Sequence, residues 1–218
     1  MKSVVVGSGG REHALAHVLG RDSDVTVTPG NPGIPNSTTQ SPLNIDADLF
    51  VIGPEAPLVD GLADQLRAQG KTVFGPGVDG AQLEGSKAWM KDLLVEANVP
   101  TAKHGTFTNE DEAIAFLSDM PLPYVIKTDG LAAGKGVIVT ESVNEAKDAI
   151  KNYLSGDAFG DAGKTVVIEE GLIGNEISIL AICDGTKAVP LAPAQDYKRL
   201  LNNDEGPNTG GMLSLIHI

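Results

Sequence analysis

The first 74 residues alternate short β-prone runs with helix-like segments, and this order restricts the fold more than any other feature of the chain. Strands that alternate with helices normally run in one direction, so the pattern predicts an α/β fold with a parallel sheet that binds ligands at the carboxyl ends of its strands. The expected strands are Lys2–Val6, Val25–Thr28, Leu49–Gly53 and Thr72–Phe74. The expected helices are Arg11–Arg21 and a segment marked by Leu58, Leu62 and Leu66. Glycine-bearing turns (GSGG, PGNPG, GPEAP and GPG) follow the four strands, and residues 29–48 show no helical period.

The first of these turns, residues 7–10, lies between a strand and a helix. The first N–H groups of a helix have no partners within it, so this arrangement predicts a phosphate cradle. It is not a dinucleotide fingerprint, because Glu12 stands where G-x-G-x-x-G requires a glycine and no ribose-binding acid follows the second strand. The sequence therefore disfavours an NAD-linked dehydrogenase, while an ordinary turn between strand and helix stays open.

A second phosphate-binding candidate is the stretch YVIKTDGLAAGKGVIVT, residues 124–140. Two β-prone runs, Tyr124–Thr128 and Val137–Thr140, flank a loop that contains Lys135 and several glycines. Alternation places Lys127 on the same strand face as Val125. Bare N–H groups and ammonium groups can meet the oxygens of a polyphosphate, which favours a nucleotide-binding hairpin. A plain β-hairpin with a flexible tip is the alternative.

The rest of the chain predicts further helices and strands around this hairpin. A composition shift near Pro100–Thr106 predicts two domains, 1–100 and 101–212. The expected helices are residues 81–98, Thr108–Asp119 with Thr108 as its cap, and a segment from Ser142 to Leu154 opened by the capping box Ser142–Glu145. The expected strands are Thr165–Glu170 and a hairpin of Glu176–Cys183 with Lys187–Leu191 around the turn Asp184-Gly185.

The composition excludes several classes of protein. A formal charge of −13 argues against nucleic-acid binding, which requires a basic surface. The start, MKSVVVGSGG, is too short an apolar run for a signal peptide or a membrane span. The one cysteine, Cys183, stands in an apolar run and is expected to be a buried strand residue. We therefore expect a cytoplasmic protein without disulfides.

Two other site classes fail on spacing. Three Gly-Lys pairs resemble a Walker A loop, but Gln65, Asp129 and Ala158 stand where the leading glycine should be. His13 and His17 lie four residues apart without the H-E-x-x-H order of a zinc site. A P-loop NTPase and a histidine metal centre are both disfavoured.

Eight short motifs occur in one order over residues 1–212, and together they resemble the phosphoribosylamine–glycine ligase (glycinamide ribonucleotide synthetase) family of the ATP-grasp superfamily. The resemblance covers about the N-terminal half of such an enzyme. The motifs are GSGGREHAL, PGNPG, GPEAPLVDG, QLEGSKAWMKD, IKTDGLAAGKGV, VIEEGLIGNEIS, QDYKR and GPNTGGM. The resemblance implies a parallel-sheet N-terminal domain followed by a partial ATP-grasp domain with a glycine-rich β-hairpin.

The resemblance also implies a reaction and its participants. ATP would phosphorylate the carboxylate of glycine, and the amine of 5-phosphoribosylamine would attack the acyl phosphate to give glycinamide ribonucleotide, ADP and phosphate. Such a ligase works mainly by positioning and charge neutralisation. The partners would be these small molecules, without nucleic acid or membrane, and we expect a monomer.

The family's site residues map onto matching positions of this chain. The implied ATP-binding residues are Lys87, Lys127, Gly134, Lys135, Gly136, Glu169, Glu170, Leu172 and Glu176, with the adenine edge at Glu169, Glu170 and Leu172 and the ribose at Glu176. The implied substrate-binding residues are Gly9, Gly10, Arg11, Glu12, Pro54, Glu55, Asp196, Lys198, Arg199, Asn208, Thr209, Gly210 and Gly211. The implied catalytic residues are Lys135, Asp196 and Lys198. A solvated strand end is the plain alternative at Glu169 and Glu170, and a polar surface loop is the alternative for the group after Asp196.

The chain departs from the family pattern in two places. Only about fifteen residues separate PGNPG from the third strand, where the family usually has a further crossover helix, so the first parallel units are expected to be incomplete. GPNTGGM is followed by residues 213–218, LSLIHI, which do not fit the family and are expected to be a foreign tail. The Mg²⁺ ligands are expected beyond the end of this chain, and we expect the 218-residue polypeptide alone to be inactive or nearly so.

Rival interpretations stay open at this point. Another ATP-grasp carboxylate–amine ligase or a carboxylase would share the hairpin and the adenine-binding strand. A non-catalytic nucleotide-binding module would bind ATP without forming an acyl phosphate from glycine.

Overall fold

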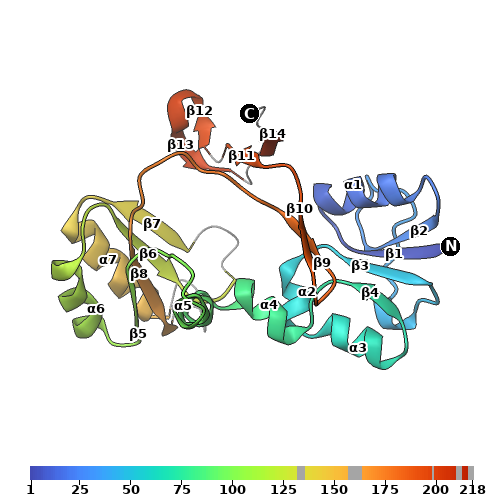
Figure 1. Ribbon diagram of the computed structural model, residues 1–218, viewed down its shortest axis with the longest axis horizontal. Coiled ribbons are helices and arrows are strands. Elements are labelled where there is room, and N and C mark those ends of the chain that lie inside the picture. Colours follow the sequence, from blue (N-terminus) through green and yellow to red (C-terminus); the bar gives the residue numbers. More distant parts are fainter. Residues whose placement is uncertain (132–135, 157–163, 198, 210–212, 216–218) are drawn as a thin grey trace.

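The computed structural model describes residues 1–131, 136–156, 164–197, 199–209 and 213–215, and it contains two α/β units joined through a pair of helices (Figure 1). The first unit is built on four parallel strands in the order β2-β1-β3-β4. The strands are β1 (Lys2–Gly7), β2 (Asp24–Pro29), β3 (Leu49–Ile52) and β4 (Thr72–Phe74). The parallel sheet that the alternating pattern predicts is confirmed.

Helices cover both faces of this sheet because its strands are apolar on both sides. Helix α1 (Gly10–Leu19) lies above the sheet in Figure 1, and α3 (Leu62–Ala68) lies below it. On the α1 side, the buried strand residues are Val5, Val25 and Val27. On the α3 side, they are Val4, Val6, Phe50 and Ile52. Full burial of one such side chain contributes about 1.5–3 kcal/mol, so these two layers hold the unit together.

The helix predicted around Leu58, Leu62 and Leu66 is in fact two helices, α2 (Glu55–Val59) and α3. Gly61 separates them with a φ of 82°, a left-handed conformation that only glycine adopts readily. Between β2 and β3 the chain forms only the short 3₁₀ helix η1 (Pro42–Asn44), so the crossover there contains no α-helix. This agrees with the absence of helical periodicity in residues 29–48.

The second unit is an antiparallel sheet in the order β5-β8-β6-β7. Its strands are β5 (His104–Phe107), β6 (Tyr124–Thr128), β7 (Val137–Thr140) and β8 (Val166–Glu170). The hairpin predicted at residues 124–140 is therefore confirmed as β6 and β7. Its tip, residues 132–135, lies outside the described residues.

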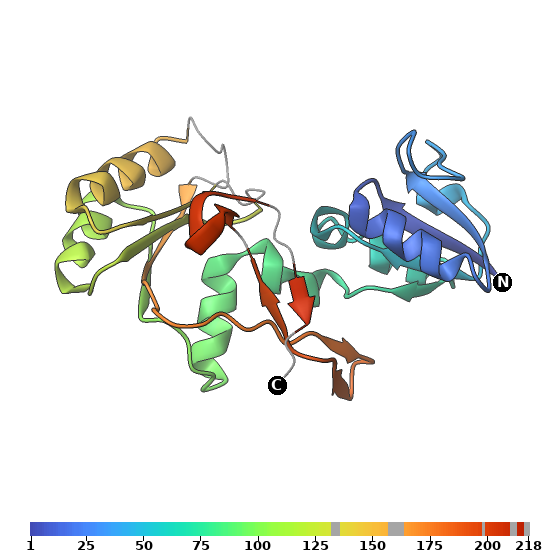
Figure 2. The ribbon, with the colours of Figure 1, turned by 90° about the horizontal axis from the view of Figure 1, so that it is seen from above.

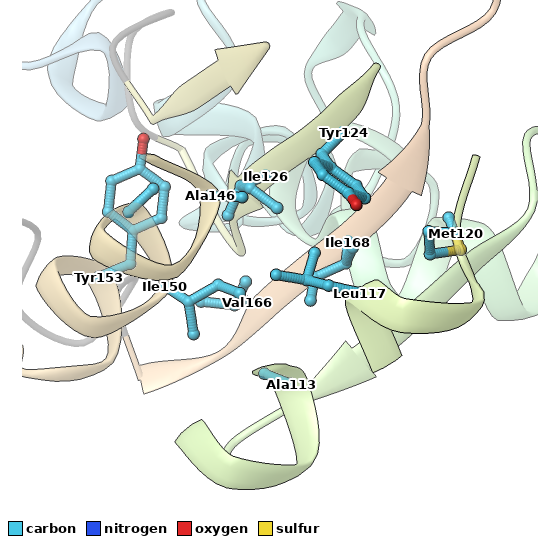
Figure 3. Close-up of a cluster of buried hydrophobic side chains, with 11 residues drawn as sticks. Ala113, Leu117, Met120, Tyr124, Ile126, Ala146, Ile150, Tyr153, Val166 and Ile168 are labelled. Carbon is cyan, nitrogen blue, oxygen red and sulfur yellow. The ribbon is translucent and has the colours of Figure 1, made fainter. Parts of the chain in front are cut away.

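Two helices, α6 (Glu110–Phe116) and α7 (Val143–Leu154), cover one face of this sheet. Alternating residues of β6 and β8, such as Ile126 and Ile168, belong to one buried cluster with Ile150 and Tyr153 of α7, and Figure 3 shows the side chains of this cluster. The other face carries the side chains that alternate with these, including Lys127 and Glu169. One face thus forms the core, and the opposite face is free to build a polar site.

The segment predicted as one helix over residues 81–98 is broken at Ser86. Helix α4 (Val78–Gly85) ends there and α5 (Lys87–Glu96) begins. Ser86 has φ −140° and ψ 116°, an extended conformation, and its hydroxyl accepts the N–H of Trp89 as an N-cap. The prediction of a continuous helix was wrong because a capping serine interrupts it.

Two predicted caps also differ from the structure. Asn109, rather than Thr108, caps α6 by accepting the N–H of Glu112. Ser142 caps α7 as expected, but the Glu145 carboxylate accepts the hydroxyl of Thr140 instead of completing the capping box. Asn is a better N-cap than Thr, so Asn109 was the stronger candidate of the two neighbours.

The chain after β8 consists of short strands outside the two larger sheets (Figures 1 and 2). The strands are β9 (Ala181–Cys183), β10 (Ala188–Pro190), β11 (Ala194–Asp196), β12 (Arg199–Leu201), β13 (Glu205–Asn208) and β14 (Leu213–Leu215), with the 3₁₀ helix Asn202–Asp204 between β12 and β13. The predicted hairpin around Asp184-Gly185 is confirmed as β9 and β10. Both strands are exposed, however, and so is Cys183, because no helix or further strand of the described residues covers this two-stranded sheet. The expectation of a buried cysteine was wrong.

None of the described helices is long and apolar enough to cross a bilayer.

Candidate functional site

The polar face of the second sheet carries an ion pair between neighbouring strands. Lys127 of β6 and Glu169 of β8 lie on the same face, because Glu169 stands opposite Val125 in the strand register. The Lys127 Nζ atom is 2.9 Å from the Oε1 atom of Glu169. The predicted nucleotide lysine is thus held by a carboxylate of the strand predicted to bind adenine.

A second lysine, Lys91 of α5, reaches the same carboxylate from the opposite side. Its Nζ atom is 2.9 Å from Oε2 of Glu169 and donates a hydrogen bond of 2.7 Å to the hydroxyl of Thr101. Lys91 is 4% exposed and Glu169 is 5% exposed. Glu169 is therefore a buried carboxylate shared by two ammonium groups, and not a solvated strand end.

The two lysines keep Glu169 ionised. Burial alone would raise the pKa of this carboxyl, but the hydrogen bonds and positive charges of Lys127 and Lys91 outweigh that effect and lower its pKa below the ordinary 4.5. The carboxylate consequently stays charged between the two ammonium groups at neutral pH.

A third lysine, Lys87, lies one helical turn before Lys91, so both point from the same side of α5. Its Nζ atom donates a 2.6 Å hydrogen bond to the carbonyl oxygen of Gly130, at the start of the β6–β7 loop. Burial lowers the pKa of Lys87, Asp129 opposes this shift and the nearby charge of Lys127 adds to it. Lys87 is thus a half-buried cation directed at the root of the glycine-rich loop.

The start of that loop is tied to α5 by Asp129. Its carboxylate accepts the N–H of Ala88 at 3.1 Å and the hydroxyl of Ser86 at 3.0 Å. The carboxylate lies at the N-terminus of α5, where negative charge is favourable. On the other side of the loop, the Gly136 carbonyl oxygen accepts the N–H of Thr128. The loop therefore leaves the sheet from a fixed base, while its predicted ligands Gly134 and Lys135 lie outside the described residues.

The ion-paired triad on the sheet face has a surplus of positive charge. Lys91 and Lys127 both pair with Glu169, which leaves one positive charge on these three residues in a chain whose formal charge is −13, while Asp129 and Glu84 lie near Lys87 and oppose its charge. A partly dehydrated surplus cation next to glycine N–H groups suits a ligand with several anionic oxygens. The residues that are present thus fit a nucleotide polyphosphate.

A second candidate site lies at the carboxyl end of the parallel sheet, where the structure brings together six predicted substrate residues from two turns. Arg11 makes two ion pairs, one with Glu12 at 2.7 Å and one with Glu55 at 3.1 Å. The remaining members of the group are Gly9, Gly10 and Pro54. The Arg11 side chain is 52% exposed, so its guanidinium remains accessible to an anionic ligand.

Glu12 has a different place from the one that the sequence suggests. It is buried, and its Oε2 atom accepts the N–H of Gly9 at 2.7 Å. Burial favours a raised pKa, but the hydrogen bonds of Arg11 and Gly9 lower the pKa of Glu12 overall. The carboxylate of the protein itself therefore occupies the N-terminus of α1, so the phosphate cradle predicted there is partly filled and Arg11 is the exposed cation beside it.

The buried Glu12 carboxylate requires glycine at position 53. A Cβ atom on Gly53 would lie 2.1 Å from the Oε1 atom of Glu12, and one on Gly7 would lie 2.4 Å from its Cγ atom. We expect Gly53→Ala to destabilise the protein by about 1–3 kcal/mol, because Glu12 must move and lose its contacts with Gly9 and Arg11. Urea unfolding checks this, with Gly174→Ala as the control, since a Cβ at Gly174 meets nothing within 4 Å. Equal stability of the two variants would contradict this arrangement.

The remaining predicted residues lie in the chain after β8. Leu172 and Glu176 are exposed in the segment that follows β8, and Asp196 ends β11. The strand register places Arg199 opposite Asn208, and Arg199 donates to the carbonyl oxygen of Gly206 at 2.8 Å. Thr209 follows β13. Lys198, Gly210 and Gly211 lie outside the described residues.

Three residues of the lysine cluster were not predicted as site residues: Ser86, Lys91 and Asp129. The i, i+4 spacing of Lys87 and Lys91 was a usable signal, because it places both on one side of a helix. The contacts of Asp129 with Ser86 and Ala88 join positions more than forty residues apart, and no local pattern shows them. Among the described residues, no group of three or more His, Cys, Asp or Glu side chains could hold a metal ion.

Comparison with known proteins identifies the family. The N domain of phosphoribosylglycinamide synthetase matches residues 1–84, and its ATP-grasp (A) domain matches residues 85–217. A phosphoribosylamine–glycine ligase of Xanthomonas campestris is 48% identical over 230 aligned residues, which cover 97% of this chain and 53% of the relative. The two domain matches meet at 84/85, at the last residue of α4, whereas the composition predicts a boundary at 100/101.

Solved structures give the same result. The crystal structure of the phosphoribosylamine–glycine ligase of Thermotoga maritima matches with a TM-score of 0.84 and 33% identity, covering all of this chain and 56% of that protein. The D-alanyl-alanine synthetase A of Vibrio cholerae matches with a TM-score of 0.69 at 15% identity, over 97% of this chain and 73% of that one, and shows the shared fold alone. The chain spans about half the length of the curated relatives that it matches. It belongs to the phosphoribosylglycinamide synthetase family, with the N domain followed by the ATP-grasp domain.

Proposed function

We propose that this chain forms the nucleotide-binding and amine-substrate-binding part of an ATP-dependent carbon–nitrogen ligase that joins glycine to 5-phosphoribosylamine. The lysine cluster at the base of the β6–β7 loop supports this most strongly, because it is a positively charged, largely buried site in an otherwise acidic chain. The membership of the family supplies the reaction class.

The chain's own residues would act by holding and orienting anions. Lys127 and Lys87 would contact the phosphates of ATP together with Lys135 and the N–H groups of Gly134 and Gly136. The end of β8 at Glu169, Glu170 and Leu172 would border the adenine, and Glu176 would accept from the ribose. Since the Glu169 carboxylate is already engaged by two lysines, its contact with the base would come from the main chain.

The reaction proposed for the whole enzyme has two steps. The γ-phosphoryl group of ATP passes to the glycine carboxylate, giving an acyl phosphate and ADP. The amine nitrogen of 5-phosphoribosylamine then forms a bond to the carbonyl carbon, phosphate leaves, and the nitrogen loses a proton. Neutralisation of the phosphoryl oxygens by lysines is the chain's main contribution to the first step. Arg11 would hold the phosphate of the amine substrate, with Asp196, Lys198, Arg199 and the segment Asn208–Gly211 closing over it.

Mg²⁺ would supply further charge neutralisation on the phosphates when bound. We propose no residue of the described part of this chain as its ligand, since that part contains no cluster of three suitable side chains. The proposal includes a cytoplasmic location and a monomeric state.

Two binding measurements on the 218-residue chain test the proposal. Isothermal titration should show saturable binding of MgATP, and ribose 5-phosphate serves as a stable probe for the amine substrate. We expect Lys127→Ala to weaken MgATP binding at least tenfold and to leave ribose 5-phosphate binding unchanged, because a charge-assisted hydrogen bond contributes about 1.5–3 kcal/mol. Arg11→Ala should weaken the binding of ribose 5-phosphate and leave the binding of MgATP unchanged.

These crossed variants control each other. Absence of binding by both ligands to the wild-type chain would overturn the proposal. Equal losses of both ligands in either variant would also count against it, because the two sites lie in different units. In an assay of the whole enzyme, if glycine and phosphoribosylamine together fail to stimulate ADP release from MgATP while bicarbonate does, a carboxylase is the better assignment.

A further inference from the structure

We infer that Lys91 is a positioning residue that keeps Lys127 available to the nucleotide phosphates by neutralising Glu169. This inference rests on the proposed function of the site. Lys91 itself is too deeply buried to bind a ligand, and its Nζ atom already contacts Glu169 and Thr101. Its effect on a nucleotide must therefore act through the carboxylate that it shares with Lys127.

The effect of Lys91 on Lys127 comes from the net charge of the two lysines and Glu169. Glu169 presents one oxygen to each lysine, Oε2 to Lys91 and Oε1 to Lys127, both at 2.9 Å. With Lys91 in place, its charge cancels that of Glu169, and the charge of Lys127 is in excess. Without Lys91, the same carboxylate would be neutralised by Lys127, and the three positions would have no net charge.

The two lysines differ in access, which gives them different roles. The Lys127 side chain is 25% exposed and stands on the strand that leads into the glycine-rich loop. Lys91 approaches from α5, and Glu169 and Thr101, which its ammonium group contacts, both lie outside the β6–β7 loop. Lys127 is thus the cation that an incoming anion can reach, and Lys91 is the fixed counter-charge behind it.

Removal of the Lys91 charge should weaken binding of a nucleotide that carries phosphates more than binding of the nucleoside that lacks them. We expect Lys91→Gln to weaken MgADP binding at least tenfold while leaving the affinity for adenosine within about twofold of wild type, because the excess charge of Lys127 acts on the phosphates, which adenosine lacks. A general loosening of the site would weaken both ligands equally. Lys151→Gln is the matched control, since it removes a positive charge from the exposed ion pair between Lys151 of α7 and Glu110 of α6. This variant should bind both ligands as wild type does.

A double variant makes the test independent of the stability of the single one. Lys91→Gln combined with Glu169→Gln removes one positive and one negative charge, so Lys127 again carries the excess charge. We expect this double variant to bind MgADP within about threefold of wild type, even if Lys91→Gln alone does not fold. Isothermal titration with MgADP and with adenosine measures all four proteins.

The outcomes separate this inference from the proposed function. A wild-type chain that binds neither MgADP nor adenosine overturns the proposed nucleotide site and this inference with it. A wild-type chain that binds both, with Lys91→Gln either unaffected or equally impaired for both ligands, overturns the inference alone. A double variant that is at least tenfold weaker for MgADP, with adenosine binding unchanged, also overturns it.

Discussion

Glu169→Ala should lower the free energy of unfolding by about 3–5 kcal/mol, because it leaves Lys91 charged, buried and without its carboxylate partner. Lys91 would keep only the hydroxyl of Thr101, which cannot balance a full charge. Urea unfolding followed by circular dichroism measures the loss. The surface variant Glu141→Ala is the control, and we expect it to change stability by no more than about 0.5 kcal/mol because Glu141 is exposed.

The pH dependence provides a second check on the same carboxylate. The pKa of Glu169 is lowered in the folded protein, so its stabilising contribution is present above the ordinary glutamate value of 4.5 and is lost as the pH falls through the lower folded value. The difference in stability between wild type and Glu169→Ala should therefore shrink in acid. A difference that is independent of pH below 4.5 would show that Glu169 is not held as a carboxylate by the two lysines.

Phe50→Ala is the second substitution from which we expect a large loss, about 3–5 kcal/mol, because it leaves a cavity in the core of the first unit. Phe50 is fully buried on β3, between residues of β1 and of α3. The matched control lies on the neighbouring strand: Phe74 of β4 is 55% exposed, and Phe74→Ala should change stability by less than about 1 kcal/mol.

The location of the loss is as informative as its size. The buried clusters of the first unit and that of the second share no residue. We therefore expect Phe50→Ala to give an early transition in thermal unfolding that reports on the first unit, while MgATP binding at the second unit persists below that transition. A single transition in which binding and structure are lost together would contradict this separation.

The sequence predicts the framework of this protein well, because the framework depends on local patterns. The apolar strands of residues 1–74 and the glycine turns between them are sufficient to indicate a parallel sheet, and alternation correctly places Lys127 on the same strand face as Val125. Membership of the family extends this framework to a list of candidate site residues. Their roles in binding stay predictions.

Several features could not be predicted, because they depend on contacts between distant residues. The helix over 81–98 breaks at Ser86, where the serine also contacts Asp129. The burial of Glu12 close to Gly53, which follows a different strand, also depends on such a contact. Cys183 stands in an apolar run that normally indicates a buried strand, but burial requires a covering layer, and the described part of the chain provides none over β9 and β10.

The exposed Cys183 gives this protein a practical advantage for spectroscopy. It is the only cysteine in the sequence, and its thiol is accessible on β9. A maleimide dye or a nitroxide spin label should therefore attach at one known position in the unmodified protein, without background from other thiols. A label there would report directly on the surroundings of the β9–β10 hairpin, and stored preparations will need a reducing agent to prevent two copies from joining through this residue.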